Sequence, residues 1–347
     1  MRFRLLFLNA ALLGTLSFCK PTQVVPPAAP LAPNLTGSLG IAGDPADATG
    51  PTTGGTVLMG GSTDVDEAIR WMVAKAGGGD FVVLRASGTA AYNTYVFSEL
   101  GGVNSCETLL INSRALANAP EVEARVRAAE AVFIAGGDQA NYVNFWKGTK
   151  LEDALNYLRN TKQVPIGGTS AGCAIQGRTY FSALNGTITS AEALANPYNS
   201  LLTLGRNDFL NTPYLADVVT DTHFNNPDRS GRLVAFLARL SQDFGVVGRG
   251  IGVEEATAVC IGADGTGKVF GRGRAFFLSQ NGSANAPETC VSGTRLHWNR
   301  GRQAVRVYQI AGTPAGTGTF DLNAWGNGTG GTSKYFYVDQ GTLGSSN

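Results

Sequence analysis

Histidines and charged residues are both scarce in this 347-residue chain, and their scarcity limits what it can do. Only His223 and His297 are present, and the five cysteines form no C-x-x-C pair, so a structural zinc site has almost no ligands to draw on. Charged residues make up 15% of the chain, with 27 basic and 26 acidic side chains. Because no run of Lys or Arg offers a phosphate-binding face, we expect no nucleic-acid partner.

The first residues are typical of an export signal. Arg2 and Arg4 precede an apolar stretch over residues 5–18, which is too short to cross a bilayer but suits a signal peptide. Residues 1–19 are therefore predicted to be a signal peptide, and the mature protein to be periplasmic or extracellular. The segment Leu16-Ser-Phe-Cys19 is also similar to a bacterial lipobox, in which a lipidated Cys19 would anchor the protein to a membrane. An ordinary signal peptide with a nearby cleavage site is the alternative.

The composition divides the rest of the chain into a tether and one domain. Residues 20–52 are rich in Pro, Ala and Gly and have little apolar periodicity, so they are predicted to be a tether. Residues 53–347 are predicted to form a single catalytic domain with a β-rich C-terminal part. Export permits disulfides, and Cys260 and Cys290, which flank a predicted hairpin, are the favoured pair. A homodimer is left open.

Apolar runs and helical spacings alternate through the first half of the domain. Strands are predicted at residues 56–59, 81–84, 108–111, 131–135 and 164–166, and helices at residues 66–76, 121–129 and 151–159. This alternation predicts an α/β fold, a parallel sheet with helices on both faces. The second half contains a predicted strand at 217–220, a helix at 231–240 and short strands from residue 256 onward, which extend the sheet or form a β-rich appendage.

The most informative motif is Gly168-Thr-Ser-Ala-Gly172, which follows a predicted buried strand. It matches the G-x-S-x-G nucleophile elbow, a tight strand-to-helix turn that exposes the hydroxyl of its central serine above the sheet. The amides at the start of the next helix would face an anion that develops beside Ser170. A glycine-rich turn with an incidental serine is the alternative interpretation.

A serine hydroxyl needs a base, and a base needs an orienting acid. His223 follows a predicted strand, where open α/β sheets place their ligands, whereas His297 lies in a late strand and is interpreted as structural. If the chain order is Ser, acid, His, the acid lies between Ser170 and His223. The candidates are Glu192, Asp208, Asp217 and Asp221. Glu192 is favoured because its loop-like segment, residues 190–198, can fold back over the elbow.

A second glycine-rich turn, Gly136-Gly-Asp-Gln139, follows the predicted strand at 131–135. In an α/β sheet it should lie beside the elbow, where its amides could donate to an oxyanion together with the amide of Ala171. Gln139 would then project toward the substrate. A β-turn that caps the next helix is the alternative.

Four motifs in the same order along the chain resemble the cyanophycinase family of serine peptidases, which is related to the aspartyl dipeptidase called peptidase E. They are Gly136-Gly-Asp-Gln139, Gly168-Thr-Ser-Ala-Gly172, Asp221-Thr-His-Phe224 with Arg229-Ser-Gly-Arg-Leu233, and Gly250-Ile-Gly-Val-Glu-Glu-Ala-Thr257. The similarity extends over about residues 57–269.

This resemblance implies a flavodoxin-like parallel sheet related to class I glutamine amidotransferases, with extra C-terminal strands. It implies a triad that cleaves peptide bonds following β-linked aspartate, without a cofactor or metal. Carried over by position, Ser170 is the nucleophile, His223 the base and Glu192 the acid. Gly137 and Ala171 become the oxyanion donors, and the substrate-pocket residues become Gln139, Asp221, Arg229 and Arg232.

Two residues near His223 depart from the family pattern. Better-known cyanophycinases have Gln before the histidine and Arg four residues after it, where this chain has Thr222 and Pro227. We therefore expect β-aspartyl or related acidic peptides, rather than cyanophycin itself, to be the substrates. An inactive family member that acts as a surface binding protein is the alternative function. A glutaminase-type amidotransferase is disfavoured because its elbow carries Cys, and Cys173 is interpreted as a packing residue.

Overall fold

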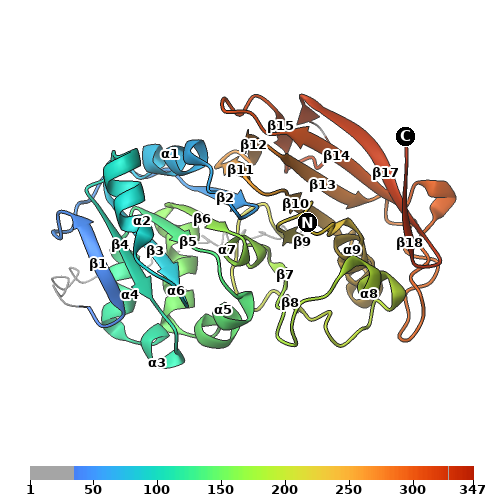
Figure 1. Cartoon of the computed structure of the whole chain (residues 1–347), viewed down its shortest axis with the longest axis horizontal. Helices are drawn as coiled ribbons and strands as arrows, with labels where there is room; N and C mark the ends of the chain where they lie inside the picture. Colours follow the sequence, from blue (N-terminus) through green and yellow to red (C-terminus); the bar gives the residue numbers. More distant parts are fainter. Residues whose placement is uncertain (1–34, 327) are drawn as a thin grey trace, which may run out of the picture. The chain divides into compact units, whose positions relative to one another are not determined.

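Two large sheets and their helices make up the part of the computed structural model that is described, residues 35–326 and 328–347 (Figure 1). The predicted signal peptide and Cys19 lie outside these residues. The first sheet has ten strands, the second has six, and a two-stranded ribbon is separate from both. No described helix is long and apolar enough to cross a membrane.

Five parallel strands form the centre of the first sheet, in the order β4-β3-β5-β6-β2. They are β2 (Gly55–Met59), β3 (Asp80–Arg85), β4 (Ser105–Leu110), β5 (Ala131–Ile134) and β6 (Pro165–Thr169). The predicted parallel α/β sheet is thereby confirmed. Strands β3 to β6 follow the 2-1-3-4 part of the flavodoxin order, and β2 occupies the place of the fifth strand.

Helices cover both faces of this sheet because its strands are apolar on both sides. In β3, Phe81 and Val83 pack against α1, whereas Val82 and Leu84 pack on the opposite face with α4, α5 and α6. The helices are α1 (Asp66–Lys75), α2 (Ala91–Thr94), α3 (Arg114–Ala117), α4 (Pro120–Ala128), α5 (Gln139–Trp146) and α6 (Lys150–Tyr157). Helices α2 and α6 continue into the π-helical turns η1 (Tyr95–Leu100) and η2 (Leu158–Lys162).

Part of the segment predicted to be a tether forms an edge strand of the first sheet. Ser38–Gly43, which falls inside residues 20–52, forms strand β1 and pairs antiparallel with β4. Ser38 Oγ donates to Glu107 Oε1 at 2.6 Å, and Leu35 is buried in the core beneath. The tether prediction is wrong for this segment because an edge strand is held by backbone pairing, which composition does not reveal.

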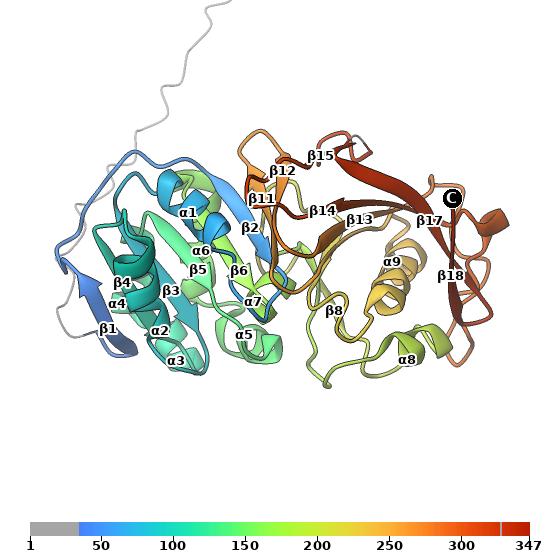
Figure 2. The same cartoon turned by 45° about the horizontal axis from the view of Figure 1, so that its top comes forward.

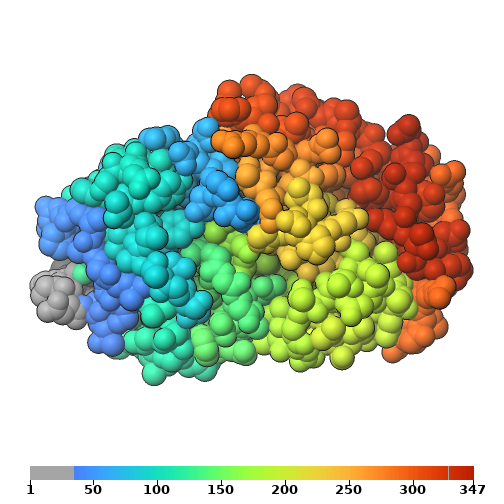
Figure 3. Space-filling model, viewed as in Figure 1, coloured from blue at the N-terminus to red at the C-terminus, as the bar shows by residue number. Residues whose placement is uncertain are grey.

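The C-terminal strands extend the first sheet and also form a separate β-rich part, the two possibilities that the sequence left open. Strands β11 (Thr257–Gly262), β12 (Thr266–Gly271), β15 (Thr319–Asp321) and β16 (Gly328–Thr329) extend the first sheet beyond β2. The second sheet has the order β18-β17-β14-β13-β10-β9. Its strands are β9 (Val218–Asp221), β10 (Arg249–Val253), β13 (Arg274–Gln280), β14 (Val305–Ala311), β17 (Gly331–Asp339) and β18 (Thr342–Ser346). The residues from about 260 onward, which include β12 to β18, gather together in the orange to red part of the surface in Figure 3.

Helix α9 (Ser230–Phe244) buries its apolar face against the second sheet, with α8 (Ser190–Ala195) beside it (Figure 2). The remaining elements are α7 (Ala171–Ala174), the ribbon of β7 (Thr179–Phe181) and β8 (Leu204–Arg206), and the short helix η3 (Arg300–Arg302). The four described cysteines are free and buried. The predicted Cys260–Cys290 disulfide is wrong, because Cys260 packs in the core under α1 and Cys290 in the core under α9.

Candidate active site

The backbone at Ser170 has the geometry of a nucleophile elbow. Ser170 directly follows β6 and precedes α7, with φ 51° and ψ −119°. A Cβ at Gly168 would overlap the carbonyl of Gly172, and a Cβ at Gly172 would overlap the carbonyl of Ile134. Both glycines are therefore required by the close approach of neighbouring backbone, and the strained serine is held between them.

Ser170, His223 and Glu255 form a hydrogen-bonded series. Ser170 Oγ lies 2.8 Å from His223 Nε2, and His223 Nδ1 lies 2.7 Å from Glu255 Oε1. His223 follows β9, and Glu255 lies in the turn between β10 and β11. A carboxylate at Nδ1 fixes the tautomer that leaves Nε2 free to accept the serine proton.

The environment of Glu255 keeps its carboxylate ionised. The hydrogen bond from His223, with a weaker one from Asn226 Nδ2 at 3.4 Å, lowers the pKa of Glu255 below its ordinary value. The Glu255 amide donates to Asn225 Oδ1 at 3.3 Å, which fixes the turn. Glu255 thus presents a charged, positioned oxygen to the imidazole at neutral pH.

The structure does not bring Glu192 to His223, and that part of the prediction is wrong. The carboxylate of Glu192 closes a capping box at the start of α8, where it accepts from the amide and hydroxyl of Thr189 at 2.9 and 2.7 Å. These bonds also lower its pKa. The error came from assuming the order Ser, acid, His. The missed signal was the motif at residues 250–257, which contains Glu255 and follows the histidine.

The predicted oxyanion donors lie beside Ser170. A Cβ built on Gly136 would be 3.5 Å from Ser170 Cβ, so the glycine turn after β5 adjoins the elbow. Gly137 and Ala171 line the same pocket as Ser170. Ala171 is the first residue of α7, whose amide has no acceptor within the helix. The arrangement is suited to an oxyanion hole.

A pocket of about 330 Å³, here called the Arg229 pocket, opens on one side of the Ser170–His223 pair. Its lining contains most of the predicted site: Gly137, Asp138, Gln139, Ser170, Ala171, Ala183, Gly186, Thr187, Thr222, His223, Arg229 and Arg232. Gln139 is therefore where the sequence predicted it. Asp221 is not part of the lining.

Asp221 and Arg232 instead form a buried ion pair. Arg232 Nε and Nη2 donate to Asp221 Oδ2 and Oδ1 at 2.8 and 2.5 Å, and both side chains are nearly inaccessible to solvent. Arg232 Nη1 donates to Thr187 Oγ1 and to the carbonyl of Ile188. The prediction that Asp221 lines the pocket is wrong, because a buried carboxylate needs a partner and Arg232 supplies it. Arg232 lines the pocket, but most of its N–H groups already donate to Asp221, Thr187 and Ile188.

Arg229 is the available cation of this pocket. Its Nη1 donates to the carbonyl of Thr222 at 2.8 Å, and no carboxylate within the described part of the chain pairs with it. Burial, followed by the nearby charge of Arg232, lowers the pKa of Arg229. A half-buried guanidinium without a counter-ion can bind a carboxylate of the substrate.

A second pocket, here called the Arg85 pocket, meets the catalytic pair and was not predicted. It has a volume of about 260 Å³ and is lined by Gly61, Ser62, Asp64, Arg85, Tyr92, Gly136, Thr169, Ser170 and His223. Ser170 and His223 are the residues that it has in common with the Arg229 pocket. The Ser170–His223 pair therefore lies at the junction of the two pockets.

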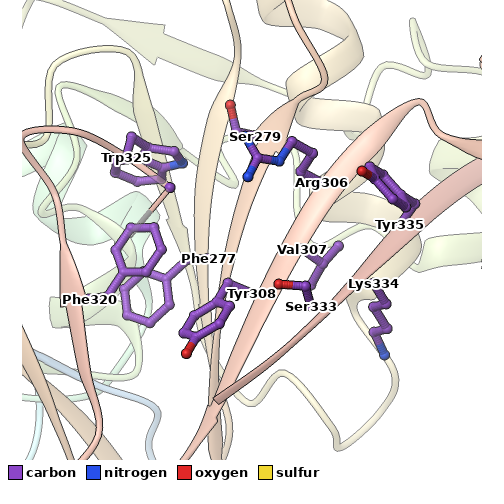
Figure 4. A pocket seen from close by; sticks show the side chains of 11 residues that line it. Phe277, Ser279, Arg306, Val307, Tyr308, Phe320, Trp325, Ser333, Lys334 and Tyr335 are labelled. Carbon is purple, nitrogen blue, oxygen red and sulfur yellow. The ribbon is translucent and has the colours of Figure 1, made fainter. Parts of the chain in front are cut away.

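A third pocket lies on the second sheet and lacks such a pair (Figure 4). Phe277, Tyr308, Phe320 and Trp325 form its aromatic side, and Arg306 and Lys334 are its cations. His297 does not line the Arg229 pocket or the Arg85 pocket. Its Nδ1 lies 3.4 Å from Asp339 Oδ1. Within residues 35–326 and 328–347, no cluster of three or more His, Cys, Asp or Glu side chains could hold a metal.

A serine on a strand-to-helix elbow, joined to a histidine and a carboxylate, defines the site of a serine hydrolase. The chain belongs to peptidase family S51, whose family model matches residues 58–267. It is 32% identical over 178 residues to a cyanophycinase from Synechococcus elongatus, covering 51% of this chain and 50% of that protein. It is 27% identical over 229 residues to a cyanophycinase from Nostoc, covering 63% of this chain and 71% of that protein. The chain thus spans about half the length of the first of these relatives.

Two solved structures match this chain at low sequence identity. A peptidase from an acI-B1 actinobacterium is 16% identical with a TM-score of 0.48, covering 65% of this chain and 91% of that one. A putative peptidase E protein from Listeria monocytogenes is also 16% identical, with a TM-score of 0.38, covering 63% of this chain and 98% of that one.

Proposed function

We propose that this protein is an exported serine peptidase that hydrolyses β-aspartyl or related acidic peptide bonds through an acyl-enzyme. The observation that carries this proposal is the series from Ser170 Oγ through His223 to Glu255, with distances of 2.8 and 2.7 Å. Both distances are within hydrogen-bond reach without any movement of the chain. Membership of peptidase family S51 supports the same reaction class.

In this mechanism Ser170 Oγ attacks the scissile carbonyl carbon while His223 Nε2 takes the hydroxyl proton. The amides of Gly137 and Ala171 stabilise the oxyanion. His223 then returns the proton to the leaving nitrogen, the C–N bond breaks, and an ester to Ser170 remains. Water, deprotonated by His223, hydrolyses this ester. Glu255 stays ionised throughout and stabilises the imidazolium.

The acidic specificity rests on Arg229. This cation faces the pocket that holds the oxyanion donors, and a carboxylate of an aspartyl residue suits its free donors. Two matched relatives are named cyanophycinase, but here Thr222 and Pro227 stand near the histidine. Proline offers no side-chain donor, so we expect cyanophycin to be a poorer substrate than small β-aspartyl peptides.

The test uses purified wild-type protein and the Ser170→Ala variant. Wild type should release amino acids from β-aspartyl dipeptides, react with a fluorophosphonate probe at Ser170 and hydrolyse cyanophycin more slowly. Ser170→Ala should lose both hydrolysis and labelling while keeping its circular dichroism spectrum. If the probe labels Ser170 but no acidic peptide is hydrolysed, the role of Ser170 as nucleophile is supported and the proposed substrate specificity is refuted. Absence of labelling would favour a binding protein instead.

Export is proposed on the composition of residues 1–19 alone. Mass spectrometry of the mature N-terminus from a membrane and a soluble fraction tests it. A diacylglyceryl mass on Cys19 in the membrane fraction would establish the anchored form. An intact Met1 in the cytoplasmic fraction would contradict export.

A further inference from the structure

The Arg85 pocket contains a cation and an acid that the proposed mechanism does not use. Arg85 ends β3, which lies two strands from β6 and its Ser170 in the order β3-β5-β6. Neighbouring strands are about 4.8 Å apart, so Arg85 and Ser170 start from positions roughly 10 Å apart on the same edge of the sheet. Because both side chains extend into this space of roughly 10 Å, the gap between their functional groups suits a short leaving group rather than a long peptide.

The guanidinium of Arg85 is held in place by its own loop. Nε donates to the carbonyl of Ser87 and Nη1 to that of Thr89, both at 2.5 Å. Gly88, with φ 108°, lets the loop approach so closely that a Cβ there would overlap Nη2. These contacts fix the plane of the guanidinium and leave Nη2 without a hydrogen-bond acceptor among the described residues. None of the ion pairs there includes Arg85.

Asp64 supplies the opposite charge in the same pocket. Its Oδ2 accepts from the hydroxyl of Tyr92 at 2.7 Å, and burial raises its pKa above the ordinary value. Asp64 and Arg85 line one pocket, but none of the ion pairs among the described residues joins them. An anion and a cation that are separate in one pocket are complementary to a molecule that carries both charges, as a free amino acid does.

We propose that the Arg85 pocket is the leaving-group subsite and that it takes a single α-amino acid with a free carboxylate. Arg85 binds the carboxylate of the residue after the scissile bond. When His223 transfers its proton to the scissile nitrogen and the C–N bond breaks, the released amine takes a further proton from water, and Asp64 faces the resulting ammonium. The enzyme thus prefers short substrates that end one residue beyond the cleaved bond. This inference rests on the proposed acyl-enzyme function.

The assignment of sides follows from what each pocket contains. The oxyanion donors Gly137 and Ala171 and the cation Arg229 lie in the Arg229 pocket, which therefore holds the acyl part. The Arg85 pocket joins it at Ser170 and His223, where the bond is cleaved. Arg85 is consequently placed to recognise the part of the substrate that departs.

The first experiment compares two substrates that differ only at the far end. β-Aspartylglycine and β-aspartylglycinamide share the acyl part, but only the first has a terminal carboxylate. Wild type should favour the free acid by roughly 10- to 100-fold in kcat/KM, as expected for one charge-assisted contact. Arg85→Ala should abolish this preference. Arg114→Ala should keep it, since Arg114 also binds backbone carbonyls, of Asn144, Lys147 and Gly148, but does not line either pocket.

A second experiment does not require peptide hydrolysis. Calorimetry on the Ser170→Ala protein should detect binding of free glycine or aspartate, no binding of glycinamide, and loss of amino-acid binding when Arg85→Ala is added. If wild type shows no preference for the free acid, or if amino-acid binding survives Arg85→Ala, the subsite is refuted. If Ser170 is not labelled by the probe but amino acids still bind through Arg85, the proposed function fails and the binding site stands.

Discussion

The Arg229 pocket and the Arg85 pocket meet at one catalytic pair but satisfy their charges in different ways. Beside the first, Asp221 is neutralised by two hydrogen bonds from Arg232, deep in the fold. In the second, Asp64 accepts from a tyrosine, and Arg85 donates to carbonyl groups. A paired buried charge builds structure, whereas charges that remain separate are available to a ligand. The aspartate is therefore paired with an arginine beside the first pocket and separate from the arginine in the second, whereas Arg229 and Arg85 each remain available to a ligand.

The largest effect is expected at the junction, where both pockets depend on the same histidine. Glu255→Gln should lower kcat by about 10³- to 10⁴-fold for every substrate, because the imidazole loses its fixed tautomer and its counter-charge. Glu192→Gln is the matched control and should change kcat by less than about 3-fold, since the Glu192 carboxylate is bound to Thr189 at the start of α8. Steady-state kinetics on both variants measure the difference.

The pKa of Glu255 sharpens this comparison. Because the folded-state pKa is lowered, the carboxylate stays ionised as the pH falls through the range where an ordinary glutamate is protonated. The Glu255 carboxyl should therefore remain mostly ionised at pH 4.5, where an ordinary glutamate is about half protonated, and carbon-13 NMR of its labelled carboxyl can follow this. A large kinetic effect of Glu192→Gln, or a mild one of Glu255→Gln, would reverse the assignment.

The next largest effect is expected from Arg229 and Arg232, which lie three positions apart at the start of α9. Arg232→Ala leaves the buried Asp221 without a partner and should destabilise the protein by about 3–5 kcal/mol. Arg229→Ala breaks a bond to one carbonyl, so it should cost little stability but raise KM for acidic substrates about 10- to 100-fold. Urea unfolding and kinetics on both variants test this division. Equal loss of stability in the two would remove the distinction between a structural and a binding arginine.

Sequence patterns predicted the fold and the tight turn at Ser170 well because both are local. The apolar runs around Val82 and Val132 form the parallel strands, and the glycines around Ser170 are required by contacts within the same turn. The acid was mispredicted because its identity depends on where the turn after β10 lies in space. The ion pair between Arg232 and Asp221 was missed for the same reason: Arg232 lies in α9 and its partner Asp221 ends β9, and the two meet because α9 packs against β9. Nothing in the sequence around Arg85 or Asp64 indicated that their separate segments line one pocket.

The smallest expected effect concerns the stability contributed by Asp64, and its sign is opposite to that at Arg232. Burial, which outweighs the hydrogen bond from Tyr92, raises the pKa of Asp64 in the folded protein above its unfolded value. The folded state therefore holds the proton to a higher pH, and the ionised carboxylate lowers stability once the pH rises past both pKa values.

The Asp64→Asn variant removes this cost and should unfold at a higher urea concentration than wild type at pH 7. The difference should disappear as the pH falls to about 4, near the unfolded value of an aspartate. A variant less stable than wild type at pH 7 would show that the hydrogen bond from Tyr92 outweighs burial. The same substitution should weaken amino-acid binding, so stability and recognition change in opposite directions at this one residue.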